Sequence, residues 1–268
     1  MTYILEDEGS YWERAWQFRH LCLNLVASDL RGRFRRTYLG GGWAILQPLV
    51  FTAIMVVVFA QLTPTTPWRE LSVYIYTGTT LWDLFSNGVL ISATSLESGG
   101  PYLRSARIPA IIFPVRAMLH AVAVNLLGLV GLLAWTLVIY PHALSVHWLF
   151  FPIYYAVVLY FATPVAVVCA LLTIKFRDFQ NMLVLLLQLL WFLSPVFMAR
   201  FIFDAPGLRA FAAFNPINSL CDLLRAFFIY GSWPAIYDVL QPIAWGTLFW
   251  LLSWRLLQRS EPSLVFDL

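Results

Sequence analysis

The sequence predicts an all-α integral membrane protein with six transmembrane helices. Of its 268 residues, 60% are hydrophobic and only 12% are charged, and the mean hydropathy is +0.74. A soluble domain carries roughly a quarter charged residues, so one globular core could not hide this apolar excess. The apolar runs are longer than barrel strands and do not alternate strictly between apolar and polar residues, which indicates helices.

The first of the six expected spans begins directly after a run of three glycines. The second span is the most polar, because it contains Asp83 and Asn87. Pro48 lies in the first span, where a packed bundle tolerates its effect on the backbone. The third segment is too long for a straight crossing, so we expect it to begin with a surface segment before Pro114. The expected spans are residues 43–62, 71–95, 108–140, 148–172, 180–198 and 235–257.

Residues 200–231 do not fit a clean crossing. They are apolar and aromatic, but Pro206, Gly207, Pro216 and Gly231 interrupt them. We expect two short re-entrant helices that dip into the outer leaflet between spans five and six and return. Non-helical backbone at that depth requires protein around it.

Residues 10–30 predict an amphipathic helix at the membrane interface. Apolar residues such as Tyr11, Phe18 and Cys22 recur at helical spacing, and most charged residues lie elsewhere. A soluble helix packed on a partner would give the same pattern. The chain then divides into a cytoplasmic N-terminal segment, a transmembrane domain and a short cytoplasmic tail, over residues 1–30, 31–258 and 259–268.

The basic residues predict the orientation. With six spans and the N-terminus inside, thirteen of the seventeen basic residues lie on the cytoplasmic side, and four of these fall within residues 31–36. Both termini are then cytoplasmic. The basic residues cluster at the ends of apolar segments. This placement indicates that they set the orientation in the membrane instead of forming a nucleic-acid-binding surface. The first twenty residues are acidic and lack the pattern of a cleavable signal, so we expect internal helices to direct insertion.

Several kinds of chemistry lack a sequence signature. No Gly-x-x-x-x-Gly-Lys-Ser/Thr loop occurs, and the three consecutive glycines precede a span rather than a soluble α/β unit. The four histidines form no metal-ligand cluster, so we expect no cofactor in this chain. Asp83 has three interpretations: a pathway residue, a group near the interface, or a partner of an arginine on another helix, with the last slightly favoured. Arg177 and Asp178 form either an ordinary charged turn or a contact for a cytoplasmic partner.

The order of the motifs resembles that of ABC-2 type permeases, in particular the branch that exports O-antigen, teichoic acid and capsule. The resemblance covers about residues 15–258, and its strength lies in the order and spacing of the motifs. They are RRTYLGGGW (35–43) with QPL (47–49), YIYTGTTLWDLFSN (74–87), PYLRSARIPAIIFP (101–114), FRD (176–178) through LSPV (193–196), and NP (215–216) with LR (224–225).

The resemblance implies a half-transporter in the bacterial inner membrane. Two copies of the chain would form a channel, and two copies of a separate P-loop ATPase, which binds ATP and magnesium, would drive it. Its substrate would be a lipid-linked polysaccharide. The expected ATPase-coupling residues are Arg104, Arg107, Ile108 and Arg177. Arg33, Arg35 and Arg36 would hold the substrate's diphosphate, although arginines facing bulk anionic lipid are the plainer alternative.

Aromatic residues supply the candidates for the channel wall, because the C–H faces of sugar rings pack on aromatic planes. Tyr74, Trp82 and Phe85 share one helical stripe of the second span. Gln188 and Trp191 extend the set from the fifth span. The alternative is a belt of aromatic residues at the membrane interface, which enriches the same residue types.

The leading hypothesis is therefore a permease subunit without a nucleotide site that exports a lipid-linked polysaccharide, with O-antigen as the expected cargo. One rival is an ABC-2 exporter of a lipid or a small molecule. A second is an intramembrane enzyme that acts on a polyprenyl-linked substrate, with Asp83 as its catalytic carboxylate. A third is a structural membrane scaffold.

Overall fold

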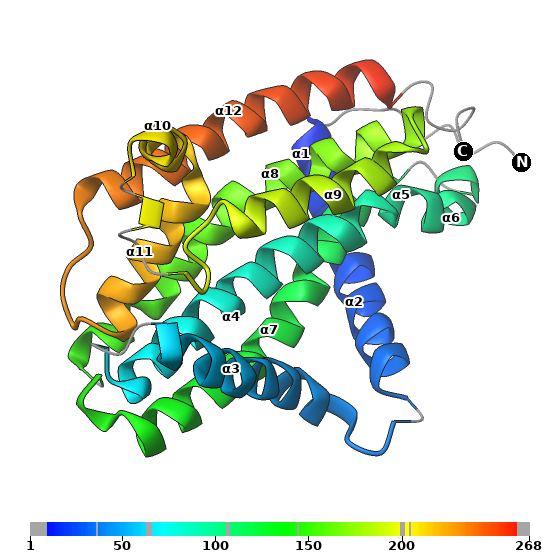
Figure 1. Cartoon of the computed structure of the whole chain (residues 1–268). Coiled ribbons are helices and arrows are strands. Elements are labelled where there is room, and N and C mark those ends of the chain that lie inside the picture. Colours follow the sequence, from blue (N-terminus) through cyan, green and yellow to red (C-terminus); the bar gives the residue numbers. More distant parts are fainter. Residues whose placement is uncertain are drawn as a thin grey trace, which may run out of the picture.

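A computed structural model describes residues 10–35, 37–62, 66–105, 108–143, 145–198, 202–203 and 205–261. These residues form helices and connecting turns, with no strand among them. The longer helices run alternately between the end of the molecule that carries α5 (Ser95–Ser98) and α6 (Gly100–Ser105) and the opposite end (Figure 1). They are α3 (Trp43–Leu62), α4 (Trp68–Ala93), α7 (Ile112–Ile139), α8 (Phe151–Lys175), α9 (Phe179–Phe192) and α12 (Ile236–Ser260).

Three of these helices have both the length and the composition to cross a membrane. They are α3 with its preceding turn, α7, and α8 with the short 3₁₀ helix η3 (Val146–Phe150) before it. Helices α4 and α12 have 26 and 25 residues, which is long enough for a crossing, but they are more polar. Helix α9 is apolar and has only 14 residues. The protein is thus a helical membrane protein, and the count of six crossings stays a prediction.

The fifth predicted span ends earlier than expected. Helix α9 ends at Phe192, and residues 193–198 form a turn instead of continuing the helix to residue 198. Pro195 disfavours a helical conformation at the residue before it. The carbonyl groups of Pro195 and Val196 accept hydrogen bonds from Arg225, at 2.5 and 3.0 Å, and so are satisfied without a helix. We call residues 193–198 the closing turn.

The predicted surface segment at the start of the third span also differs. Helix α7 begins at Ile112, and residues 108–111 precede it without helical structure. Ile108 and Ile111 are buried, and they pack with Leu257 of α12 and Ile174 of α8. This segment therefore fills the space between helix ends instead of lying exposed on a surface.

Two short helices lie between α9 and α12, as predicted. They are α10 (Pro206–Phe214) and α11 (Pro216–Phe228), and they lie at the end of the molecule opposite α6 (Figure 1). Asn215 starts α11, because its side chain accepts a hydrogen bond from the Ile217 backbone at 3.0 Å and donates one to Ser194 at 2.8 Å. Their re-entry into a membrane stays a prediction.

The N-terminal segment forms two helices instead of one. Helices α1 (Tyr11–Gln17) and α2 (Arg19–Phe34) meet at Phe18. The indole of Trp12 stacks on that of Trp254 in α12, with ring centroids 5.4 Å apart. Asp29 of α2 accepts two hydrogen bonds from Arg116 of α7, one of them at 2.7 Å. Both helices are therefore fixed to the long helices, and their position at a membrane interface stays a prediction.

Candidate translocation groove

Three of the predicted channel residues line a single groove of about 350 Å³ between α3, α4 and α9. Trp82 comes from α4, and Gln188 and Trp191 come from α9, where a spacing of three residues places them on one face. We call this cavity the groove. Its wall combines aromatic, amide, hydroxyl and carboxyl groups: Gln47, Pro48 and Phe51 of α3, Thr79, Trp82, Asp83, Ser86 and Leu90 of α4, and Leu187, Gln188 and Trp191 of α9.

Aromatic rings connect the wall of the groove to the closing turn. The ring of Trp191 lies 4.7 Å from that of Phe197 and 6.2 Å from that of Phe51, between ring centroids. Phe197 in turn contacts Phe59 of α3 at 5.4 Å. Because Phe197 belongs to the closing turn, this turn and the wall of the groove are packed as one unit.

Gly78 allows the closing turn to approach α4. A Cβ atom at this position would lie 1.9 Å from the Val196 carbonyl oxygen, so only glycine leaves the space. Arg225 of α11 holds the turn from the other side, and its side chain is only 1% exposed. Its Nη2 atom donates to the carbonyls of both Pro195 and Val196. The turn is therefore clamped between a glycine and a buried cation.

Tyr74 and Phe85 do not line the groove. The Tyr74 hydroxyl donates to the Met198 carbonyl at 3.0 Å, and its ring lies 3.4 Å from the guanidinium carbon of Arg225, which fits a cation–π contact. Tyr74 thus helps to hold the closing turn. Phe85 is buried in the core and stacks on Phe161 of α8, with centroids 5.6 Å apart.

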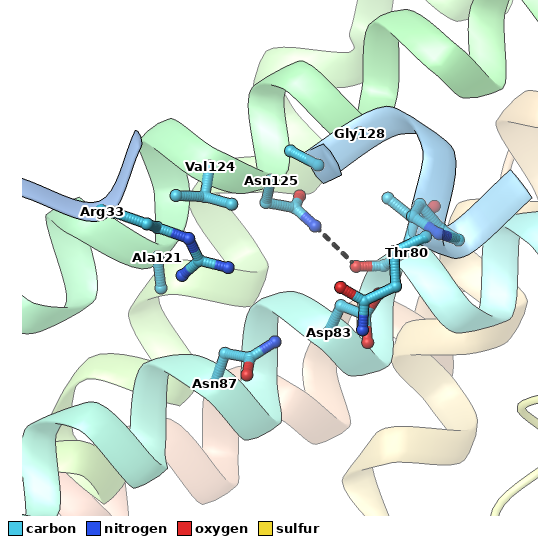
Figure 2. Close-up of a pocket in the computed structure, with 11 residues that line it drawn as sticks. Arg33, Thr80, Asp83, Asn87, Ala121, Val124, Asn125 and Gly128 are labelled. Atoms are coloured by element: carbon cyan, nitrogen blue, oxygen red, sulfur yellow. Dashed lines mark hydrogen bonds between the residues drawn. The ribbon is translucent and has the colours of Figure 1, made fainter. Parts of the chain in front are cut away.

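A smaller cavity of about 60 Å³ adjoins the groove, and we call it the inner cavity. Gln47, Pro48 and Asp83 line both spaces. Figure 2 shows the Arg33 side chain entering the inner cavity from the end of α2, with Asn87 and Asp83 on the facing side of α4. A volume of this size holds about two water molecules. The two spaces are therefore neighbours, and Gln47, Pro48 and Asp83 lie between them.

Asp83 occupies the wall that the two spaces share. Within the described ranges it forms no ion pair, so the favoured sequence interpretation, pairing with an arginine on another helix, is not what the structure has among these residues. From the sequence, a role as a pathway residue was one of three alternatives for Asp83. Its carboxyl group instead faces the cavities, where it can accept hydrogen bonds from a polar ligand or water.

Pro48 and Gly128 shape the inner cavity. Proline lacks a backbone N–H, so Pro48 leaves the Ala44 carbonyl without its helical donor. Gly128 of α7 lies opposite this carbonyl, and a Cβ atom there would be 3.3 Å from the oxygen. Nearby, Asn125 of α7 donates to the Thr80 carbonyl at 2.8 Å, and Figure 2 shows this hydrogen bond. These buried polar contacts fix α4 against α7.

Comparison with curated proteins supports the resemblance that the motifs indicate. An O-antigen export system permease protein RfbA of Myxococcus xanthus is 29% identical over 221 residues, which are 80% of this chain and 82% of that protein. Two Klebsiella pneumoniae proteins of the same name are 21% identical over 213 and 212 residues, 79% of this chain and 81% of each relative. No protein-family model matches the chain. The similarity to these three proteins, over about four fifths of each chain, supports an ABC-2 type permease of the polysaccharide-export branch.

The remaining predicted residues of this ABC-2 permease lie near the helix ends. Arg104 of α6 and Arg177 of the turn before α9 are exposed, whereas Ile108 is only 7% exposed and packs against other helix ends. Arg35 is exposed where α2 ends. Arg36 and Arg107 lie outside the described residues.

The groove of the permease is a candidate path for a ligand. In the part of the chain that the structure describes, no three histidine, cysteine, aspartate or glutamate side chains gather closely enough to hold a metal ion. The side chains that line the groove suit a ligand that has both apolar faces and hydroxyl groups, because they include aromatic rings and hydrogen-bonding groups.

Proposed function

We propose that this permease is the membrane subunit of an ABC transporter that exports O-antigen, as a lipid-linked polysaccharide, across the bacterial inner membrane. The observation that carries the proposal is the groove, where Trp82 and Trp191 lie beside Gln188 and Asp83. Sugar rings pack their C–H faces on aromatic planes, and their hydroxyls hydrogen-bond to amides and carboxylates. The name of the relatives, O-antigen export system permease, supports the same cargo.

The substrate enters at the end of α2 and passes the inner cavity to reach the groove. The guanidinium groups of Arg33, Arg35 and Arg36 receive the diphosphate of the lipid carrier, because guanidinium groups match phosphate geometry. Arg33 reaches from this cluster into the inner cavity, which adjoins the groove. The cytoplasmic placement of this end, and of both termini, rests on the excess of basic residues at one side.

A second copy of the permease completes the channel. The groove of one chain, at about 350 Å³, holds only one or two sugar units of a polysaccharide that must pass through. Its flanking helices expose apolar side chains, among them Val57 and Ile54 of α3 and Leu185 and Leu189 of α9. Two copies that face each other across these helices would enclose one larger passage.

The energy comes from two copies of a separate P-loop ATPase that binds ATP and magnesium, since this chain has no nucleotide-binding motif. Helix α6 and the turn before α9 lie at the same end of the molecule in Figure 1. Arg104 and Arg177 belong to these two segments and dock this ATPase, together with Arg107 and Ile108, which follow α6 in the sequence.

Gene deletion and complementation test the proposal. Deletion should remove the polysaccharide from the cell surface and leave it inside the cell on its lipid carrier. The Trp82→Ala and Trp191→Ala variants should restore only a small fraction of surface polysaccharide, whereas Trp68→Ala, at the exposed start of α4, should restore it fully. Unchanged surface polysaccharide in the deletion strain would contradict the proposal. Turnover of a polyprenyl-linked glycan by the purified chain, without an ATPase, would instead support an enzyme.

A further inference from the structure

A second large pocket lies at the end of the permease opposite α6, and we call it the outer pocket. Its volume is about 350 Å³, and it lies between the start of α4, helix α11 and the link from α11 to α12. Figure 1 shows this link and α11 at the end of the molecule away from α6. The lining residues are Tyr74, Asp222, Arg225, Ala226, Tyr230, Ser232, Trp233, Pro234, Ala235 and Asp238.

The link that forms one wall of this pocket has a fixed shape. Gly231 has a φ of +55°, a conformation that favours glycine. The backbone N–H groups on either side of it donate back to α11, from Tyr230 to the Arg225 carbonyl at 3.0 Å and from Ser232 to the Ala226 carbonyl at 2.9 Å. Pro234 restricts the chain further. The aromatic residues of the link are therefore held in place before any ligand binds.

Two aromatic rings of the link stay accessible. Trp233 packs against Phe150 and His147, with ring centroids 4.6 and 5.5 Å apart, but it remains 63% exposed. Tyr230 is 60% exposed. Large aromatic rings anchored on one side and open on the other are suited to stack on the apolar face of a ligand.

The polar groups of the outer pocket narrow the class of ligand. Asp222 and Asp238 contribute carboxylates, and Arg225 contributes a guanidinium group to the inner wall. Carboxylates accept hydrogen bonds from hydroxyl groups, and a guanidinium group donates them. The combination of open aromatic rings with carboxylate acceptors and a guanidinium donor matches the apolar faces and hydroxyl groups of a sugar.

We infer that the outer pocket is a saccharide-binding site that receives a sugar unit of the exported glycan as it leaves the groove; this rests on the proposed function. Arg225 and Tyr74 connect the two spaces physically. Both line the outer pocket, and both hold the closing turn, whose Phe197 packs on Trp191 of the groove wall. A glycan that passes the closing turn therefore meets the outer pocket next, and binding there opposes its return.

Photocrosslinking in living cells tests this inference with the strain's own polysaccharide as the probe. The photoreactive residue benzoylphenylalanine replaces Trp233 or Tyr230 in the full chain, expressed with its ATPase. An antiserum against the strain's surface polysaccharide then detects glycan attached to the permease. We expect ultraviolet-dependent attachment at both positions, and its loss when the ATPase is inactivated. Phe214, which is 72% exposed on α10 at the same end of the molecule, is the control position and should give no attachment.

The same assay separates this inference from the proposed function. Attachment at Trp191 in the groove, together with none at Trp233 and Tyr230, would overturn the outer site and leave the export function standing. No attachment at any of the three positions would count against both. The Asp222→Asn and Asp238→Asn pair should lower the attachment at Tyr230 several-fold at equal permease abundance. An unchanged yield would contradict the role of the carboxylates.

Discussion

The contact between Gly78 and the closing turn leads to a quantitative prediction for Gly78→Ala. A Cβ atom at Gly78 would meet the Val196 carbonyl oxygen at 1.9 Å and the Arg225 Nη2 atom at 3.0 Å. The turn must therefore move away from α4. Overpacking of this kind costs about 1–3 kcal/mol, and loss of the charge-assisted bond from Arg225 to Val196 costs about 1.5–3 kcal/mol more. Alanine regains about 1 kcal/mol through its helix propensity.

The net loss in the free energy of unfolding is then about 1.5–5 kcal/mol. Denaturation of the purified permease in detergent, followed by circular dichroism, measures it. Gly32→Ala is the matched control, because a Cβ atom at Gly32 would have no heavy atom within 4 Å. That control should be as stable as the native chain or slightly more so. If Gly78→Ala unfolds at the same denaturant concentration as Gly32→Ala, the clamp on the closing turn is not as the structure describes it.

Three further predictions concern the helix ends. Asp29→Asn should weaken the ion pair that joins α2 to Arg116 of α7 by about 1 kcal/mol and so speed tryptic cleavage within α2 about fivefold. An unchanged cleavage rate would show that this ion pair does not hold α2 against α7. Burial raises the pKa of Glu261 above its usual value, so its contribution to stability is full at low pH and is lost as the pH rises through the folded-state pKa. Glu261→Gln should therefore lose less thermal stability than the native chain between about pH 4 and pH 7, and parallel curves would contradict this. Arg104→Glu should reduce co-purification of the ATPase several-fold, whereas Arg209→Glu at the opposite end should not; equal recovery would remove Arg104 from the docking surface.

The sequence predicted the helical class because composition and run length alone determine it. Where local signals define both ends of an element, the bounds also agree: α3 begins at Trp43 after three glycines and ends at Leu62, as predicted. The predicted end of the fifth span, residue 198, was wrong by six residues, because α9 ends at Phe192. Pro195 is a local cause, and the second cause is Arg225, which is far from the closing turn in sequence and satisfies its carbonyls in space. Such a contact leaves no local pattern.

The groove was predictable only in part. Trp82, Gln188 and Trp191 were chosen as aromatic and amide residues on helical stripes, and the structure brings these three together. The same stripe included Tyr74 and Phe85, which lie elsewhere. Helix α4 is buried on most of its circumference, so periodicity could not tell which face meets a neighbour and which faces a cavity. Asp83 has the same ambiguity, because a carboxylate in a span signals function without naming its partner.

Chemical blocking of the groove shows whether the glycan passes along it. The three native cysteines are buried, so a cysteine introduced by Gln188→Cys can be modified selectively with a bulky thiol reagent. The measurement is ATP-driven transfer of lipid-linked O-antigen in vesicles that contain the permease and its ATPase. We expect that modification of the cysteine at position 188 abolishes transfer. Modification of the cysteine in Val130→Cys, on the exposed face of α7, should leave transfer intact. Full transfer through a permease modified at position 188 would contradict the claim that the glycan passes along the groove.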